Sequence, residues 1–459
     1  MEWNDTIYLS LLLISIGFGH FIRQVEDVVV KKWVSTFTGI VLVYIVSGLH
    51  IIHPLICTAL NGFIITCLPL SCFHLVSFIF TFGYLFFFRT TVYFGVEYPP
   101  AHTNAVQMML TLKLVGLAFE VNEARKMNKK NDEGNNEDQW ERTTPLPGFM
   151  DIFHYSFCYA GVLTGPYFRY RTYLDFLHTP FAKYANCLEA TVNKLKYVPM
   201  YAALFLISGY VFPLKYAEEE EFYIDRSVLY RIWYLTPCFF NFRMRIYSGF
   251  VLSECACIMA GVGAYPSVGD SKPGRGPAAY KLVKQMSSDP KKLENVKYDF
   301  ETVHNIDPYR ADFVCTFREA MKTWNMAVQY WLAIHVYKRT PRSIRLAATM
   351  FMSSIWHGVY AGYYLCLCSV PFYLPVEDLY DRLFRKEASG LAREMYDWMF
   401  WFTRMQAFSY MGIAFLLLDV KAIIRYWSSI YFVGHALTAI AYVIGVCFLK
   451  MKKTSSHKK

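Results

Sequence analysis

Two polar side chains inside apolar stretches carry the functional groups that acid–base chemistry needs. His357 lies in the uncharged run Leu346–Val376, where an ionisable group is costly and often functional. Its imidazole can take up a proton near neutral pH. Asn325 lies in the preceding apolar segment, in a Trp-Asn-Met context. Its amide can donate a hydrogen bond to a developing negative charge. The pair therefore indicates a base and a hydrogen-bond donor.

Each of these residues also has a purely structural interpretation. A single histidine or asparagine in a membrane helix often makes only an interhelical hydrogen bond. If the segment around Asn325 is a continuous helix, Asn325 and Gln329 share one face. On the same reasoning Ser353, Ser354 and His357 share a face of the next helix, and Gly358 leaves room for another group. Four other histidines are better explained as structural or interfacial: His50, His53, His74 and His435.

The chain that positions these residues has the composition of an integral membrane protein. Hydrophobic residues make up 55% of its 459 residues and charged residues only 18%, against about 25% charged in soluble domains. The net charge is +10, but 38 Phe, 35 Tyr and a mean hydropathy of +0.23 do not fit a basic patch over an ordinary core. A nucleic-acid-binding protein, a disordered chain, a disulfide scaffold and an ordinary cytosolic enzyme are all excluded.

Uncharged runs predict an all-α polytopic fold with roughly eleven transmembrane or re-entrant helices. The run Trp33–Phe88 is long enough for two or three spans, and Leu346–Val376 and Tyr426–Leu449 are further runs. Shorter candidates are Ile7–Ile22, Asn104–Phe119, Ile152–Phe168, Tyr197–Leu214, Leu229–Tyr247, Gly249–Tyr265, Thr323–Tyr337 and Met405–Leu418. Several are short for a full crossing, so tilted or broken helices are expected.

Charges at the two ends predict the topology. Arg23, Lys31 and Lys32 follow the first apolar run, which places the N-terminus on the luminal side. The tail 450–459 is basic and is expected in the cytosol. We expect one domain over residues 1–459, with polar loops at 122–148 and 266–312. In the second loop the Gly274–Gly276 stretch lacks the ending of a phosphate-binding loop and predicts a flexible turn.

The two motifs together resemble the membrane-bound O-acyltransferase family. The resemblance consists of an Asn after Trp and, further along, Trp-His-Gly at 356–358 inside a long apolar run. It extends over nearly the whole chain to the lysophosphatidylinositol acyltransferases of that family. The segments that carry this extension are 103–107, 161–173, 242–245, 263–266, 298–302 and 425–427.

The resemblance implies a multi-pass enzyme of the endoplasmic reticulum membrane. A buried tunnel would bring acyl-CoA from the cytosolic side, and a lysophospholipid would enter from the bilayer. The implied reaction moves a polyunsaturated acyl chain, arachidonoyl in particular, onto the free hydroxyl of lysophosphatidylinositol during phospholipid remodelling. His357 would be the catalytic base, and Asn325 would bind the oxyanion or orient the substrate. No cofactor or metal is expected, because a thioester is already activated.

Both substrates carry phosphate, so basic residues are expected to bind them. The candidates for coenzyme A follow the Asn325 segment, and a positive-inside flank explains them equally well: Lys338, Arg339 and Arg342. The candidates for the inositol phosphate headgroup lie in the motif segments: Arg169, Arg171 and Arg243.

Other functions remain open at this point. Another acceptor within the same family, such as a different lysophospholipid, a sterol or a protein, leaves the same motifs. A polytopic transporter would place Asn325 and His357 along an aqueous pore, although an internal repeat typical of many transporters is missing. A haem protein would need two histidines facing one cofactor. A non-catalytic scaffold is the remaining alternative.

Overall fold

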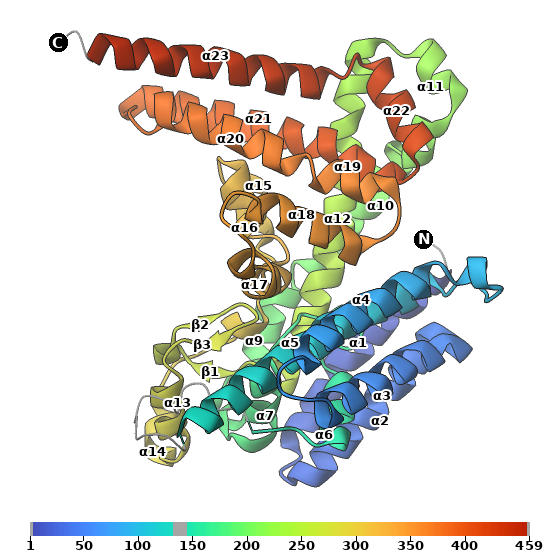
Figure 1. The fold of residues 1–459 in the computed structure, drawn as a ribbon, viewed down its shortest axis with the longest axis vertical. Helices are drawn as coiled ribbons and strands as arrows, with labels where there is room; N and C mark the ends of the chain where they lie inside the picture. Colours follow the sequence, from blue (N-terminus) through green and yellow to red (C-terminus); the bar gives the residue numbers. More distant parts are fainter. Residues whose placement is uncertain (1–2, 132–144, 457–459) are drawn as a thin grey trace. The chain divides into compact units, whose positions relative to one another are not determined.

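Helices dominate the chain. The computed structural model describes residues 3–131 and 145–456 (Figure 1). Strands in these residues form two short antiparallel pairs. They are β1 (Tyr265–Pro266) with β4 (Tyr298–Asp299) and β2 (Ser271–Lys272) with β3 (Gly276–Pro277). The predicted all-α class is confirmed.

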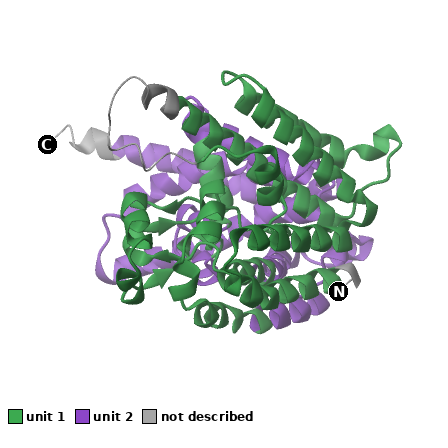
Figure 2. Ribbon diagram, turned by 90° about the horizontal axis from the view of Figure 1, so that it is seen from below, with its two compact units in different colours: residues 1–199, 248–306, 325–335 green, residues 200–247, 307–324, 336–459 purple. Residues whose placement is uncertain are grey.

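The chain folds into two compact units, each built from several stretches of sequence (Figure 2). The first unit comprises residues 1–199, 248–306 and 325–335. The second comprises residues 200–247, 307–324 and 336–459. Asn325 therefore belongs to the first unit and His357 to the second.

Long N-terminal helices form most of the first unit. They are α1 (Trp3–Gln24), α2 (Val28–Ser47), α3 (Ile52–Cys67), α4 (Phe73–Arg89) and α5 (Ala101–Asn131), with 3₁₀ turns η1 (Gly48–Ile51) and η2 (Thr91–Phe94). A buried polar seam joins α3 to α4. The Asn61 amide donates to Thr81 Oγ1 over 2.8 Å and accepts from Ser77 Oγ over 2.6 Å. Because an unpaired polar group is costly in apolar surroundings, these bonds fix how α3 and α4 align.

Shorter elements complete the first unit. They are α6 (Phe149–Ser156), α7 (Tyr170–His178), α8 (Phe181–Tyr184), α9 (Cys187–Leu195), η5 (Ser267–Gly269), α13 (Tyr280–Ser287), α14 (Pro290–Glu294), η6 (Glu301–Val303) and α17 (Met326–His335). Residues 266–306, predicted as part of a polar loop, are folded. Buried Val283 and Leu293 pack in one cluster with Phe181 and Tyr265. These residues form a small apolar core, which the polar composition of the segment did not predict.

The turn predicted at Gly274 is present between β2 and β3. The Gly274 N–H donates to Thr302 O over 2.8 Å, and φ is +70°. A Cβ placed on Gly274 would lie 3.2 Å from the Cα and the carbonyl oxygen of Ala327. Glycine is needed because the turn between β2 and β3 lies directly against the first turn of α17.

The second unit has an aromatic core. Its elements are α10 (Val198–Val211), which begins in the first unit, η4 (Leu214–Glu218), α11 (Glu220–Asp225), the first part of α12 (Val228–Ala260), α15 (Pro308–Phe313), α16 (Phe317–Lys322), η7 (Tyr337–Arg339), α18 (Arg345–His357), α19 (Ala361–Leu367), α20 (Val370–Tyr380), the π-helical turn η8 (Asp381–Arg385), α21 (Gly390–Leu417), α22 (Val420–Ser429) and α23 (Val433–Ser456). Phe222, Tyr234 and Tyr426 are fully buried in one cluster with Trp427.

The uncharged run around His357 is broken into the three short helices α18, α19 and α20. Gly358 ends α18, and Pro371 lies in the first turn of α20. None of the three is long enough for a full crossing. This agrees with the expectation of broken helices.

Five helical segments in the described residues are long and apolar enough to cross a membrane. They are Asp5–Gln24, Val28–Cys67, Ala101–Lys126, Cys187–Glu218 and Val433–Met451. A sixth apolar helix, Phe73–Arg89, is shorter. The number of roughly eleven crossings stays a prediction.

The ends of two predicted polar segments also differ from expectation. Residues 122–131 continue α5 instead of forming a loop, because their Ala, Arg, Lys, Met and Glu residues favour helix. Residues 450–456 of the predicted tail are the end of α23. Residues 145–148 form neither helix nor strand, and the remaining residues of these two predictions, 132–144 and 457–459, lie outside the described residues.

Candidate active site

His357 is the last residue of α18, where its ring is half-buried among other rings. Its centroid lies 5.0 Å from that of Phe415 on α21, edge to face at 82°, and 5.8 Å from that of Tyr363 on α19. The adjacent Trp356 ring lies at 4.9 Å. The imidazole thus has an apolar, low-dielectric environment on several sides, which strengthens any electrostatic interaction that it makes.

Gly358 allows this packing. A Cβ at Gly358 would lie 2.4 Å from Cε2 of Tyr363, which is closer than any side chain tolerates. The group that occupies the space beside Gly358 is therefore the Tyr363 ring. Ser354, predicted to be near His357, donates to Met350 O over 2.9 Å and is fully buried. These contacts end α18 and turn the chain into α19.

Asn325 lies just before α17, and its backbone is in the left-handed region with φ of +50°. Its carbonyl accepts from the Gln329 N–H over 3.0 Å. The prediction that Asn325 and Gln329 share a face of one continuous helix is wrong, because the helix begins after Asn325. Asparagine tolerates the left-handed region better than most residues, and residues held there cluster at functional sites.

Asn305 caps the helix that follows Asn325. The Asn305 carbonyl accepts from the Met326 N–H over 2.7 Å, and Asn305 Oδ1 accepts from the Ala327 N–H over 3.2 Å. These are two of the N–H groups that a helix start leaves without a partner. The peptide groups that follow Asn325 are therefore held by a residue from another segment of the first unit.

The predicted coenzyme A ligands lie on the surface of the second unit. Lys338 and Arg339 are in η7, Arg342 follows in the next turn, and all three are exposed. The neighbouring Arg345 stacks over the Tyr337 ring at 4.5 Å. An exposed group of cations suits the phosphates of a soluble nucleotide.

The predicted headgroup ligands are divided between the units, and each has protein contacts. In the first unit the Arg169 Nε lies 3.4 Å from Glu120 Oε1, and Arg171 stacks over Tyr280 at 4.4 Å. In the second unit Arg243 is buried, and its Nε lies 3.4 Å from Asp312 Oδ1. Glu120 and Asp312 offset the charges of Arg169 and Arg243.

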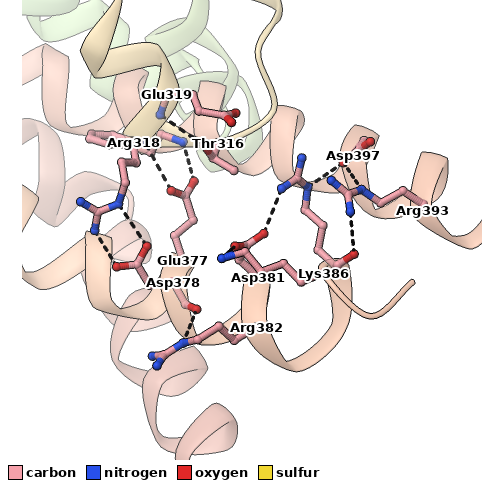
Figure 3. Close-up of polar contacts among 12 residues, drawn as sticks. Thr316, Arg318, Glu319, Glu377, Asp378, Asp381, Arg382, Lys386, Arg393 and Asp397 are labelled. Carbon is pink, nitrogen blue, oxygen red and sulfur yellow. Dashed lines mark hydrogen bonds and ion pairs between the residues drawn. The ribbon is translucent and has the colours of Figure 1, made fainter. Parts of the chain in front are cut away.

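A network of charged residues at the end of α20 holds the segment that leads to Asn325 (Figure 3). Buried Glu377 accepts from the backbone N–H groups of Phe317 over 2.6 Å and Arg318 over 3.3 Å, at the start of α16. The Arg318 guanidinium also donates twice to Asp378, over 3.2 and 2.6 Å. Because burial disfavours the carboxylate, the pKa of Glu377 is raised to about 7.

Further along, η8 is tied to α21 by a second part of this network. Arg385 donates to Asp381 over 2.9 Å and to Asp397 over 2.6 Å, and Arg393 also contacts Asp397 (Figure 3). The π-helical turn is thus stabilised by charge pairs on both sides. Such pairs contribute most where they are shielded from water.

The part of the chain that the structure describes contains no evident metal-binding site. No group of three or more His, Cys, Asp or Glu side chains there could hold an ion. All twelve cysteines are free thiols, including Cys255 and Cys257, which are buried.

Two contributing residues were not assigned a role from sequence. Asn305 and Glu377 hold backbone N–H groups on either side of the segment that ends at Asn325. Glu377 gave a weak signal, as a carboxylate directly after an uncharged run. Asn305 gave no signal, because it lies in a polar stretch.

Comparison with known proteins identifies the family. Residues 91–419 match the sequence model of MBOAT, the membrane-bound O-acyltransferase family. A membrane-bound acylglycerophosphatidylinositol O-acyltransferase of Drosophila melanogaster is 43% identical, over 99% of this chain and 94% of that protein. Proteins of the same description from Xenopus laevis and Homo sapiens are 38% and 39% identical, over 100% and 97% of this chain and 97% and 93% of their own lengths.

These matches agree with the motifs at Asn325 and His357 and with the helical fold. They cover nearly the full chain, including both compact units. The resemblance noted from sequence is confirmed: this chain belongs to the membrane-bound O-acyltransferase family.

Proposed function

We propose that this enzyme transfers a fatty acyl chain from acyl-CoA to the free hydroxyl of lysophosphatidylinositol. The observation that carries the proposal is the full-length similarity to acylglycerophosphatidylinositol O-acyltransferases, combined with an imidazole packed among aromatic rings at the end of α18. Arachidonoyl is the favoured chain, and the reaction belongs to phospholipid remodelling in the endoplasmic reticulum membrane.

In this mechanism neutral His357 takes the proton of the lipid hydroxyl as its oxygen attacks the thioester carbonyl. The C–O bond forms, and the carbonyl oxygen becomes an oxyanion. The oxyanion then collapses, the C–S bond breaks, and the imidazolium returns the proton to the departing thiolate. Free coenzyme A and the diacyl lipid leave, and no acyl-enzyme forms.

Asn325 supplies the second group. Its side-chain NH₂ donates to the oxyanion or orients the lipid hydroxyl, and one such donor is worth about 3–4 kcal/mol. The fixed left-handed backbone at Asn325 supports this role, because a preorganised donor needs no reorientation during the reaction. Aromatic packing around His357 supports the exclusion of water, which limits hydrolysis of the thioester.

Basic residues bind the two phosphate-bearing substrates. The exposed Lys338, Arg339 and Arg342 bind phosphates of coenzyme A at the cytosolic face. Arg169, Arg171 and Arg243 are the headgroup candidates. The mechanism requires no metal or other cofactor.

The test is an acyltransferase assay on the purified full chain in lipid nanodiscs. It offers arachidonoyl-CoA or oleoyl-CoA with each of four acceptors in turn: lysophosphatidylinositol, lysophosphatidylcholine, lysophosphatidylserine and lysophosphatidylethanolamine. Selective transfer to lysophosphatidylinositol is expected. Preference for another acceptor would discard the headgroup assignment and keep the reaction, and preference for oleoyl-CoA would discard the arachidonoyl assignment.

A further inference from the structure

Glu254 is a buried charge that the proposed mechanism does not use. It lies on α12 with 0% of its surface exposed. It is also the one charged residue in the apolar stretch 249–265. A buried carboxylate is costly unless it is paired and hydrogen-bonded, so its contacts indicate what it stabilises.

Its two oxygens have different partners. Glu254 Oε1 accepts from the backbone N–H groups of Asn305 over 2.7 Å and Ile306 over 2.9 Å. Glu254 Oε2 is paired with the Lys194 ammonium on α9. Hydrogen bonds from backbone N–H groups to a carboxylate are charge-assisted and stronger than neutral ones. Glu254 therefore fixes the backbone of the 305–306 segment.

The same Asn305 holds the helix that follows Asn325. Its carbonyl accepts from Met326 N–H and its side chain from Ala327 N–H. Asn305 therefore links Glu254 to the peptide groups after Asn325 by hydrogen bonds. All of these residues lie in the first unit. The Gly274 turn packs against the same first turn of α17.

We propose that Glu254 is a positioning residue for Asn325: by holding the backbone of Asn305, it fixes the helix start that orients the Asn325 amide. This rests on the role of Asn325 in the proposed function. A left-handed asparagine persists only where its surroundings over-determine it, and the chain of bonds from Glu254 supplies that restraint. Lys194 offsets the charge, so that Glu254 remains an effective acceptor.

The test is a double-mutant cycle of Glu254→Gln with Asn325→Gly, measured as kcat and KM on the full chain in nanodiscs. Glutamine keeps the shape but is a weaker acceptor and leaves the Lys194 ammonium without its anion. Since misplacing a group by about 1 Å can cost ~100-fold, Glu254→Gln is expected to lower kcat by about 10- to 100-fold. KM for both substrates stays within about twofold, because binding is not altered.

The decisive measurement is the same substitution in the Asn325→Gly background. If Glu254 acts through Asn325, Glu254→Gln lowers kcat there by less than about twofold. Because the Asn325→Gly enzyme is slow, its rate is measured from radiolabelled product collected over hours. An equal loss in both backgrounds, or normal kcat for Glu254→Gln alone, would overturn the inference while leaving the role of Asn325 intact. Full activity of Asn325→Gly would instead overturn that part of the proposed function.

A matched control comes from the same unit. Asp151 also pairs with a lysine, Lys32, over 2.7 Å and accepts a backbone N–H, that of Gly148, over 3.1 Å. Asp151→Asn is expected to keep kcat within about twofold, because its contacts are with α2 and the start of α6.

A second pair of variants tests the connection if Glu254→Gln does not fold. Asn305→Ala removes the side-chain cap on Ala327, whereas Asn305→Asp keeps an oxygen there. Asn305→Ala should lower kcat at unchanged KM, and Asn305→Asp should restore it. Equal kcat for the two variants would overturn the inference.

Discussion

Asn325 and His357 lie in different compact units, and their surroundings differ in kind. Around Asn325 the contacts are polar and directional: Asn305 caps the following helix, and a buried carboxylate holds Asn305 in turn. Around His357 the described contacts are rings and a glycine, with Phe415 and Tyr363 packed against the imidazole.

The difference matches the roles proposed for the two residues. An amide that stabilises charge must point in one direction, and hydrogen bonds to its backbone set that direction. A base must exchange a proton with two different partners, and the Phe415 and Tyr363 rings hold the imidazole in position for that exchange. Substitutions near Asn325 should therefore act through lost hydrogen bonds, and those near His357 through volume.

The largest expected effect is that of His357→Ala. Loss of a general base lowers kcat by about 10²- to 10⁴-fold, with the protein still folded. Radiolabelled acyl transfer in nanodiscs measures this. His435→Ala is the control, because His435 lies on α23 and contacts Tyr410 and Trp427; it should retain most activity. Near-normal turnover of His357→Ala would remove His357 from the mechanism.

Asn325→Gly separates the amide from the backbone. Glycine adopts φ of +50° without strain, so only the side chain is lost. The expected loss in kcat is about 10²- to 10³-fold, and Asn325→Ala should lose at least as much. An active glycine variant beside an inactive alanine variant would show that Asn325 supplies only its backbone conformation. Asn325 and His357 would then differ in their structural surroundings, but the Asn325 side chain would have no catalytic role.

Gly358→Ala tests the role of volume beside His357. Its Cβ would lie 2.4 Å from the Tyr363 ring, so the ring and the imidazole must shift. We expect about tenfold lower kcat and a free energy of unfolding lower by about 1–3 kcal/mol, measured by thermal denaturation. Tyr363→Leu in the same chain should partly restore both.

Gly83→Ala on α4 is the matched control for that substitution. Nothing lies within 4 Å of a Cβ at Gly83, so it should be neutral or slightly stabilising. If Gly358→Ala were equally harmless, packing around His357 would be looser than its contacts indicate.

The remaining prediction concerns pH and stability, and no change in catalysis is expected from it. Since burial raises the pKa of Glu377 from 4.5 to about 7, the folded protein binds this proton more tightly than the unfolded chain. Its stabilising contribution is present below about pH 4.5 and is lost as the pH rises to about 7, by about 3 kcal/mol in total. Melting temperature should therefore fall between pH 5 and pH 7.5.

Glu377→Gln should flatten that part of the pH profile, because glutamine does not titrate. Exposed Glu394 on α21 provides the control, and Glu394→Gln should leave the slope unchanged. A slope that is identical in all three proteins would assign the pH dependence to other groups.

Local patterns predicted the helical class and the family, and the catalytic roles of the two candidate residues stay predictions. Each apolar run, and the Trp-His-Gly motif, consists of consecutive residues, so these features can be read from the sequence without knowledge of the fold. The backbone of Asn325 was not predictable, because its neighbours favour helix and the cap comes from Asn305, distant in sequence. Glu254 was noticeable as a charge in an apolar stretch, but its partners at 305 and 306 are a long-range feature.

The predicted polar loop at 266–312 contains short helices and strands that its composition did not predict, for a similar reason. Composition predicts exposure, but a small core needs only a few apolar residues such as Val283 and Leu293 when distant aromatic residues complete it. The turn at Gly274 was predicted from its glycines, but its packing against α17 was not, because α17 is distant in sequence.

The short helices around His357 have a consequence for biogenesis. With 13 residues, α18 is about 20 Å long, whereas a bilayer core is about 30 Å thick. A segment of this kind is a poor substrate for insertion as an independent hydrophobic helix, and its helix ends need protein partners at that depth. The region that carries His357 should therefore reach its native position late, after longer helices such as α23 are already in the membrane.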